Sequence, residues 1–316
     1  MKKPLHVPAA PHLALIAVQI LFATWPIVGK IALRTTPSVA LVGFRVGGGA
    51  LAFVGLARAR GALRAIARRD WLLLIVSSCL GVVLNQWLFV KGLSLTGAIN
   101  ATLLSTTIPI STLLAGILLG TEHSALRRTI GIALAAVGVV YLIGPSRASF
   151  SGSTRLGDLL IVANSLCYGA YIAISKPLVQ RYNALTVITW IFVVACVATV
   201  PVGIVSFLRT DLTRMSPGAW VATVYIILLP TVASYYLNAW ALARVPPSTV
   251  AVYIYLQPLI AFGVAPLVLG EALTWRAVIA SILIFAGVLM VTRRSRQKTH
   301  RRRQAAGSEE QEALWS

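Results

Sequence analysis

Arg45 is the residue of this sequence best placed to bind a charged group, because it stands inside a long apolar stretch. A charge is costly to bury there and usually faces a cavity or a polar partner. Counted along a helix at about 1.5 Å per residue, Trp25, Asn85 and Gln86 lie about as far from the ends of their own apolar stretches as Arg45 does. A guanidinium, an aromatic face and two amides suit a carboxylate or another anionic group. In the alternative interpretation, Arg45 bonds backbone carbonyls and only holds helices together.

A second group of polar and aromatic residues follows in the latter half of the chain. Their hydroxyls and amides need partners in apolar surroundings, which a solute or neighbouring helices would supply. The residues of this group predicted to contact a bound solute are Tyr168, Tyr171, Tyr235, Asn238, Tyr255 and Gln257. Pro109 and Pro258 fall near the middle of apolar stretches, where the missing N–H and the ring clash loosen a helix. We predict that they are hinges, with packing kinks as the alternative.

Carboxylates and histidines, the groups that usually carry protons, are missing from the interior of the apolar stretches. Acidic residues such as Asp70, Glu122, Asp158 and Glu271 stand at or beyond their edges, and the four histidines are terminal or in loops. A cavity without fixed negative charge disfavours a lipophilic cation. Motifs of metalloproteases, serine hydrolases and phosphate loops are absent as well. The sequence therefore predicts neither an enzyme nor an ATP-driven pump, and no metal or cofactor.

The elements that position these residues follow from composition. Of 316 residues, 58% are hydrophobic and 11% are charged, which is too apolar for a soluble domain. A helix needs roughly 20 apolar residues to cross a bilayer core. The stretches that meet this requirement are 12–34, 37–57, 71–91, 98–119, 127–143, 157–176, 185–207, 219–242, 248–269 and 275–292. We therefore expect an all-α integral membrane protein of about ten transmembrane helices, with the first stretch retained rather than cleaved as a signal peptide.

Charge patterning predicts how the chain lies in the membrane. The net charge of +20 comes from basic clusters between apolar stretches, which does not resemble a nucleic-acid surface. With the amino terminus inside, most basic residues fall on the cytoplasmic side. We expect both termini in the cytoplasm of a bacterial-type inner membrane. The expected partners are a small solute and lipids, which the basic tail would contact unless it is simply solvated. Monomer and homodimer both stay open.

An internal repeat is visible in the sequence. A shift of 149 residues places Pro109 on Pro258 and Glu122 on Glu271, and a shift of 146 places Trp25 on Tyr171. Because five helices are an odd number, the second copy would enter the membrane from the opposite side. Two halves related by an axis in the membrane plane can exchange inward-open and outward-open states, which is alternating access.

The chain resembles the EamA type of the drug/metabolite transporter superfamily. The resemblance rests on Trp25-Pro-Ile-Val-Gly-Lys30 at the end of the first stretch, on Arg45, and on the Pro-plus-Glu patterns ending stretches four and nine. It implies a basket of helices one to four and six to nine around a central cavity, with helices five and ten at the periphery. The expected domains are an amino-terminal segment 1–11, repeats 12–143 and 157–292, a periplasmic linker 144–156 and a tail 293–316.

The function expected from these features is secondary transport, by alternating access, of a small organic metabolite. Export is the expected direction, and the solute is expected to be amino-acid-like, anionic or zwitterionic. The main alternative is a multidrug efflux carrier. A channel, a scaffold and an intramembrane enzyme are further alternatives.

Overall fold

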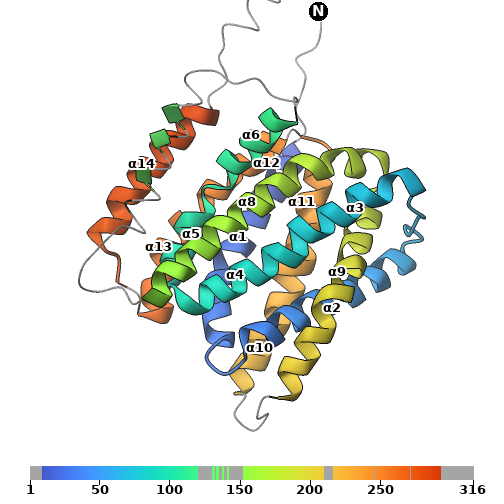
Figure 1. Ribbon diagram of the computed structural model, residues 1–316, viewed down its shortest axis with the longest axis horizontal. Coiled ribbons are helices and arrows are strands. Elements are labelled where there is room, and N and C mark those ends of the chain that lie inside the picture. Colours follow the sequence, from blue (N-terminus) through green and yellow to red (C-terminus); the bar gives the residue numbers. More distant parts are fainter. Residues whose placement is uncertain are drawn as a thin grey trace, which may run out of the picture.

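The computed structural model describes residues 9–119, 130–131, 133–134, 137–138, 141, 152–209, 216–245, 247–270 and 272–292. Nearly all of these residues are helical, and none of them forms a strand (Figure 1). The α-helices are α1 (Ala9–Ala32), α2 (Ser38–Ala59), α3 (Trp71–Ser78), α4 (Leu84–Leu95), α5 (Ala98–Ser105), α6 (Ile108–Leu118), α8 (Gly152–Arg181), α9 (Ala184–Leu208), α10 (Pro217–Ile226), α11 (Ser234–Leu242), α12 (Pro247–Val252), α13 (Leu256–Leu269) and α14 (Trp275–Thr292).

Several of these helices join end to end into longer helical segments, which are long and apolar enough to cross a membrane. The seven candidate spans are Ala9–Ala32, Ser38–Ala59, Arg68–Leu95, Ala98–Leu118, Thr154–Arg181, Ala184–Leu208 and Pro217–Leu242. Two shorter apolar helices, Thr249–Phe262 and Trp275–Gly287, correspond to the expected stretches nine and ten. The expected stretch 127–143 falls mostly outside the described residues, as do Glu122 and Glu271. The predicted fold class, a helical membrane protein, is confirmed.

Local sequence sets where these helices begin and end. The side chain of Asn183 accepts a hydrogen bond from the backbone N–H of Thr186 at 2.8 Å and starts α9. Ser216 starts α10 in the same way, with Pro217 as the first helical residue. Gly270 ends α13 with a φ of 68°, a left-handed conformation that favours glycine.

The packing brings α1 to the middle of the bundle, where it contacts α11 and α13, while α8 packs on α4 and α6 (Figure 1). Gly43 of α2 meets Gly203 of α9, and a Cβ added at either glycine would lie 2.8 or 2.6 Å from the Cα of the other. These helices can therefore approach closely only because both positions lack a side chain. Helix α14 lies at the edge of the bundle (Figure 1), as expected of the tenth helix.

Two of the candidate spans, Arg68–Leu95 and Pro217–Leu242, contain a π-helical turn at corresponding places. The first, η2 (Cys79–Val83), joins α3 to α4, and the second, η4 (Ile227–Ala233), joins α10 to α11. The 149-residue shift places η2 on 228–232, inside η4. A π-helical turn frees backbone groups from their usual partners and often marks a functional site. The repeat in the sequence is thus matched by an irregularity of the backbone.

The two predicted hinge prolines also stand next to irregular backbone. Pro109 is the second residue of α6, directly after the turn that separates α5 from α6. Pro258 is the third residue of α13, after the 3-10 turn η5 (Tyr253–Tyr255). A proline is tolerated in the first turn of a helix because no N–H is needed there. Each proline therefore begins a helical segment rather than bending the middle of one, and its hinge action stays a prediction.

One end of the bundle gathers the loop 60–67, the connection 181–183 and the connection 243–245, and we call it the basic end. Arg181 forms an ion pair with Asp70, and the hydroxyl of Tyr182 donates to the same carboxylate at 2.7 Å. The backbone N–H of Ala67 donates to the Tyr182 oxygen at 3.0 Å. These bonds hold the loop after α2 against the corner between α8 and α9. By charge, this is the end expected to face the cytoplasm.

Candidate functional site

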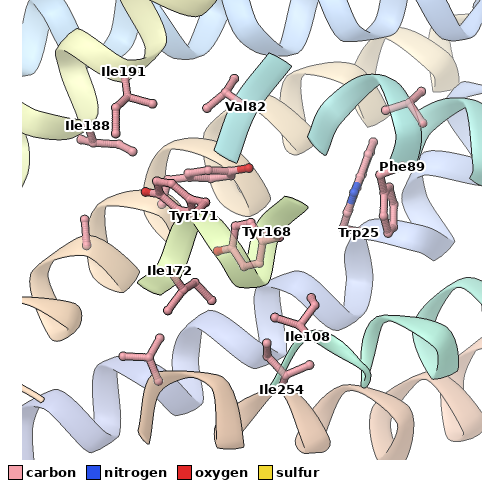
Figure 2. Packing of buried hydrophobic residues seen from close by; sticks show 14 of the residues in the cluster. Trp25, Val82, Phe89, Ile108, Tyr168, Tyr171, Ile172, Ile188, Ile191 and Ile254 are labelled. Atoms are coloured by element: carbon pink, nitrogen blue, oxygen red, sulfur yellow. The ribbon is translucent and has the colours of Figure 1, made fainter. Parts of the chain in front are cut away.

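A cavity of about 60 Å³ lies where the two halves of the chain meet. Helices α1, α2, α4, α5 and α6 line it from the first half, and α8, α11, α12, η5 and α13 line it from the second. Figure 2 shows part of its apolar wall, with the stacked rings of Trp25 and Phe89 and the side chains of Ile108, Tyr168 and Ile254. Such a volume holds a few water molecules, whereas pockets for small organic ligands usually measure about 300–1,000 Å³.

Arg45 is the only charged residue among the described residues that line this cavity. Its side chain is 2% exposed. Its Nε donates to Thr231 Oγ1 at 2.6 Å and its Nη1 donates to Gln86 Oε1 at 2.7 Å. The guanidinium carbon lies 4.0 Å from the centre of the Trp25 ring, a cation–π contact. Arg45 therefore binds side chains of three other helical segments, not the backbone carbonyls of the alternative interpretation.

No carboxylate in the described part of the chain pairs with Arg45. That part contains two carboxylates, Asp70 and Asp158. The first binds Arg181 at the basic end, and the second accepts hydrogen bonds from Thr96 and Asn100. The positive charge is thus balanced by dipoles and an aromatic face. Because a guanidinium has five N–H donors and these contacts use Nε and Nη1, donors remain for a ligand.

A chain of hydrogen bonds extends from Arg45 into the other predicted residues. Gln86 Nε2 donates to the hydroxyl oxygen of Tyr235 at 2.9 Å. The Tyr235 hydroxyl lies 3.2 Å from both the carbonyl oxygen of Gly81 and the Oδ1 of Asn85, and its one hydrogen can serve either. Gln86 is buried behind Arg45 and does not line the cavity. Its role in this geometry is to orient Arg45 and Tyr235.

The network joins the two π-helical turns reciprocally. Arg45 of the first half binds Thr231, which lies in η4 of the second half. Tyr235 of the second half binds Gly81, which lies in η2 of the first half. The hydroxyl of Thr231 in turn donates to the carbonyl of Ile226, five residues earlier, at 2.8 Å. Each half therefore attaches its polar side chain to the irregular turn of the other half.

The remaining predicted residues divide between the cavity and its surroundings. Tyr168 and Asn238 line it and form a hydrogen bond of 3.1 Å, and Gln257 lines it while donating to Gln19 at 2.6 Å. Tyr171 and Tyr255 do not line it. The ring of Tyr171 covers Gly81 behind the wall, and that of Tyr255 packs on Phe285 of α14.

Sequence reasoning missed several residues of the site. Gln19 and Asn164 line the cavity, and Thr231, which does not line it, accepts a hydrogen bond from Arg45. A signal existed for two of them, because Asn164 stands four residues before Tyr168, and Thr231 stands four residues before Tyr235. Residues four apart share a face of a helix. Asn164 also donates to the backbone carbonyl of Asn85 at 2.8 Å, across α8 and α4.

Comparison with known proteins gives this arrangement a family. Residues 10–144 and 155–293 both match the EamA-like transporter family. The chain belongs to the EamA-like transporter family. Among the relatives of this chain, an uncharacterized transporter of Archaeoglobus fulgidus is 27% identical over 72% of this chain and 78% of its own length. A protein of Streptantibioticus cattleyicolor, named a probable terminal-alkyne amino-acid exporter, is 30% identical over 85% of this chain and 90% of its own length.

A solved structure extends the likeness to three dimensions. One crystal structure matches this EamA-like chain with a TM-score of 0.64, covering 89% of this chain and 97% of the other. At 18% identity, the match shows the fold alone. Family and relatives together confirm the resemblance stated from the sequence. They indicate a multi-pass membrane transporter rather than an enzyme, acting on a small-molecule solute.

Proposed function

We propose that this EamA-like protein is a secondary carrier that exports a small, amino-acid-like solute of anionic or zwitterionic charge. The observation that carries the proposal is the buried Arg45, which faces the cavity without a described carboxylate to neutralise it. A solute carboxylate can form a charge-assisted pair with the guanidinium and so offset part of its lost hydration. A cation would instead meet like charge in a space of low dielectric constant.

The other lining residues suit the rest of such a solute. The rings of Trp25 and Phe89, whose centres lie 5.6 Å apart, offer a flat apolar surface for a side chain. Across the cavity, the Nδ2 of Asn238 donates to Tyr168, so the carbonyl oxygen of the same amide can accept from an amino group. Binding would thus place the carboxylate at α2 and the amino group between α8 and α11.

The small size of the cavity supports a mechanism of alternating access. A volume of about 60 Å³ does not admit an amino acid, so the halves must separate before a solute enters. The reciprocal bonds from Arg45 to η4 and from Tyr235 to η2 cross the boundary between the halves. A carboxylate that replaces Gln86 or Thr231 at Arg45 would loosen this link, coupling binding to movement.

The amino-acid preference has separate support from a relative. The Streptantibioticus protein, 30% identical to this chain, is named for the export of an amino acid. Multidrug efflux, the runner-up, most often concerns lipophilic cations, for which the described lining provides no negative charge. We therefore place an amino-acid-like metabolite first.

Transport by the purified protein in proteoliposomes tests the proposal with three probes. L-phenylalanine is zwitterionic, its amide keeps the side chain but is cationic, and tetraphenylphosphonium is a lipophilic cation. We expect saturable counterflow of L-phenylalanine or of another amino acid that competes with it, and none of the two cations. Transport of the cations alone would overturn the proposal in favour of drug efflux. Conductance without saturation would identify a channel.

A further inference from the structure

A second and larger cavity opens at the basic end of the bundle. Its volume is about 720 Å³, many times that of the central cavity. It is lined by the start of the loop after α2, by the corner between α8 and α9, and by one side of α11 with the two residues that follow that helix. Neighbouring residues of α11 serve the two cavities separately, since Tyr235 and Asn238 line the central one and Tyr236 and Trp240 line this one. We call this second cavity the vestibule.

Two arginines give the vestibule its charge. The guanidinium of Arg244 lies 3.9 Å from the centre of the Trp240 ring, and its Nη1 donates to the backbone carbonyl of the same tryptophan at 2.8 Å. The guanidinium of Arg60 lies 6.0 Å from the centre of the Tyr236 ring. Both arginines are exposed, and each rests on an aromatic residue of the same face of α11. An arginine stacked on a ring keeps its N–H edge free to bind a carboxylate.

No described lining residue neutralises these charges. The other polar lining groups are the amides of Gln180 and Asn183. The nearest described carboxylate at this end, Asp70, is already bound by Arg181 and Tyr182. Lys176 donates to the backbone carbonyls of Leu242 and Val245 at 2.6 and 2.7 Å, and so offsets the negative end of α11 beneath Arg244. The vestibule is therefore a positively charged, partly aromatic hollow.

We infer that the vestibule is a first binding site for carboxylate-bearing solutes, in which Arg60 and Arg244 bind the carboxylate and Trp240 and Tyr236 bind an apolar or aromatic body. This inference rests on the proposed function and adds a capture step before Arg45. A surface site of like chemistry raises the local concentration of the solute and speeds its encounter with the carrier. Since the basic end is the one expected in the cytoplasm, capture there agrees with export.

Fluorine NMR with 4-fluorobenzoate tests the vestibule apart from the central site. The full-length protein carries Arg45→Gln, to silence the central anchor, and sits in nanodiscs of phosphatidylcholine at low salt. We expect broadening of the fluorine signal that Arg60→Gln together with Arg244→Gln reduces at least fivefold. The neutral analogue 4-fluorobenzamide should show little broadening. High salt should weaken the effect, because exposed charges are screened over a few ångströms.

Matched controls make the outcome decisive. Arg209→Gln removes an exposed arginine from the other end of α9 and should leave the broadening unchanged. If Arg45→Gln does not fold, the same comparison on the wild-type background gives the vestibule contribution. Equal broadening with and without the two vestibule arginines overturns the inference. So does retention of phosphatidylglycerol by these arginines in native mass spectrometry without benzoate binding, which would make the vestibule a lipid site. Either result leaves Arg45 and the proposed function untouched.

Discussion

The guanidinium of Arg45 is held in an apolar bundle by two neutral side chains and an aromatic ring. A buried charge without a counter-ion is costly, and the dipoles of Thr231 and Gln86 recover only part of its lost hydration. An incoming carboxylate supplies the missing negative charge. At the scale of the residue, binding of an anion recovers part of the free energy lost by burying the charge of Arg45, and this gain favours binding.

Replacing Arg45 by lysine keeps the charge but removes the planar fork. We expect the apparent affinity for the solute to fall about 10-fold or more, since a charge-assisted hydrogen bond contributes about 1.5–3 kcal/mol. Membrane insertion should survive. Counterflow in proteoliposomes measures the change in KM, with Arg209→Lys as the control. Normal transport by Arg45→Lys would return Arg45 to a purely structural role.

The sequence predicted part of this site and missed the rest for physical reasons. Helical rise placed Trp25, Arg45 and Gln86 at one depth, and they are in contact. Rise alone does not tell which side of a helix faces inward in a bundle with apolar residues all round. Tyr171 and Tyr255 were therefore expected in the cavity but are not among the residues that line it.

At the scale of the element, Gly81 in η2 makes room for the ring of Tyr171. A Cβ at this position would lie 2.4 Å from the ring, so Gly81→Ala must displace either the ring or the π-helical turn. We expect a loss of about 1–3 kcal/mol, typical of overpacking, and a lower unfolding temperature in detergent. Gly55→Ala is the matched control, because no atom lies within 4 Å of its added Cβ. In an exposed helix interior it should be neutral or stabilising.

The breaks before Pro109 and Pro258 lead to a kinetic prediction. If these breaks are hinges, Pro109→Ala with Pro258→Ala should lower kcat several-fold and leave KM within about twofold, because the change affects movement rather than binding. Transport rates against solute concentration separate the two constants. The control is Pro201→Ala, since Pro201 lies inside the regular helix α9. Unchanged kcat in the double variant would reduce both prolines to packing features.

At the scale of the whole molecule, charge predicts orientation. Reporters fused after Arg69, after Arg181 and at the tail should be cytoplasmic, and reporters near Ser151 and Asp211 should be periplasmic. Alkaline phosphatase and green fluorescent protein fusions measure the two sides. A periplasmic carboxyl terminus would contradict the ten-helix arrangement.

Composition and the internal repeat together predicted the fold class, since a chain with 58% hydrophobic residues is too apolar to fold as a soluble domain. The internal breaks were not predictable at this level. Pro230 lies in η4, where its missing N–H interrupts regular hydrogen bonding, but η2 consists of apolar residues and Gly81, so no residue type common to both turns specifies them. They depend on contacts between helices that a linear pattern does not contain.

The matching π-helical turns also bear on the origin of the molecule. An added residue in one helix is a rare event, and η2 and η4 hold it at the same place in both halves. The simplest history is a single insertion in a unit of half this length, followed by duplication. Before the gene doubled, that ancestor would have met an inverted copy of itself, with the bulge of each subunit at the shared boundary. On this history, the contact between the halves is older than their joining.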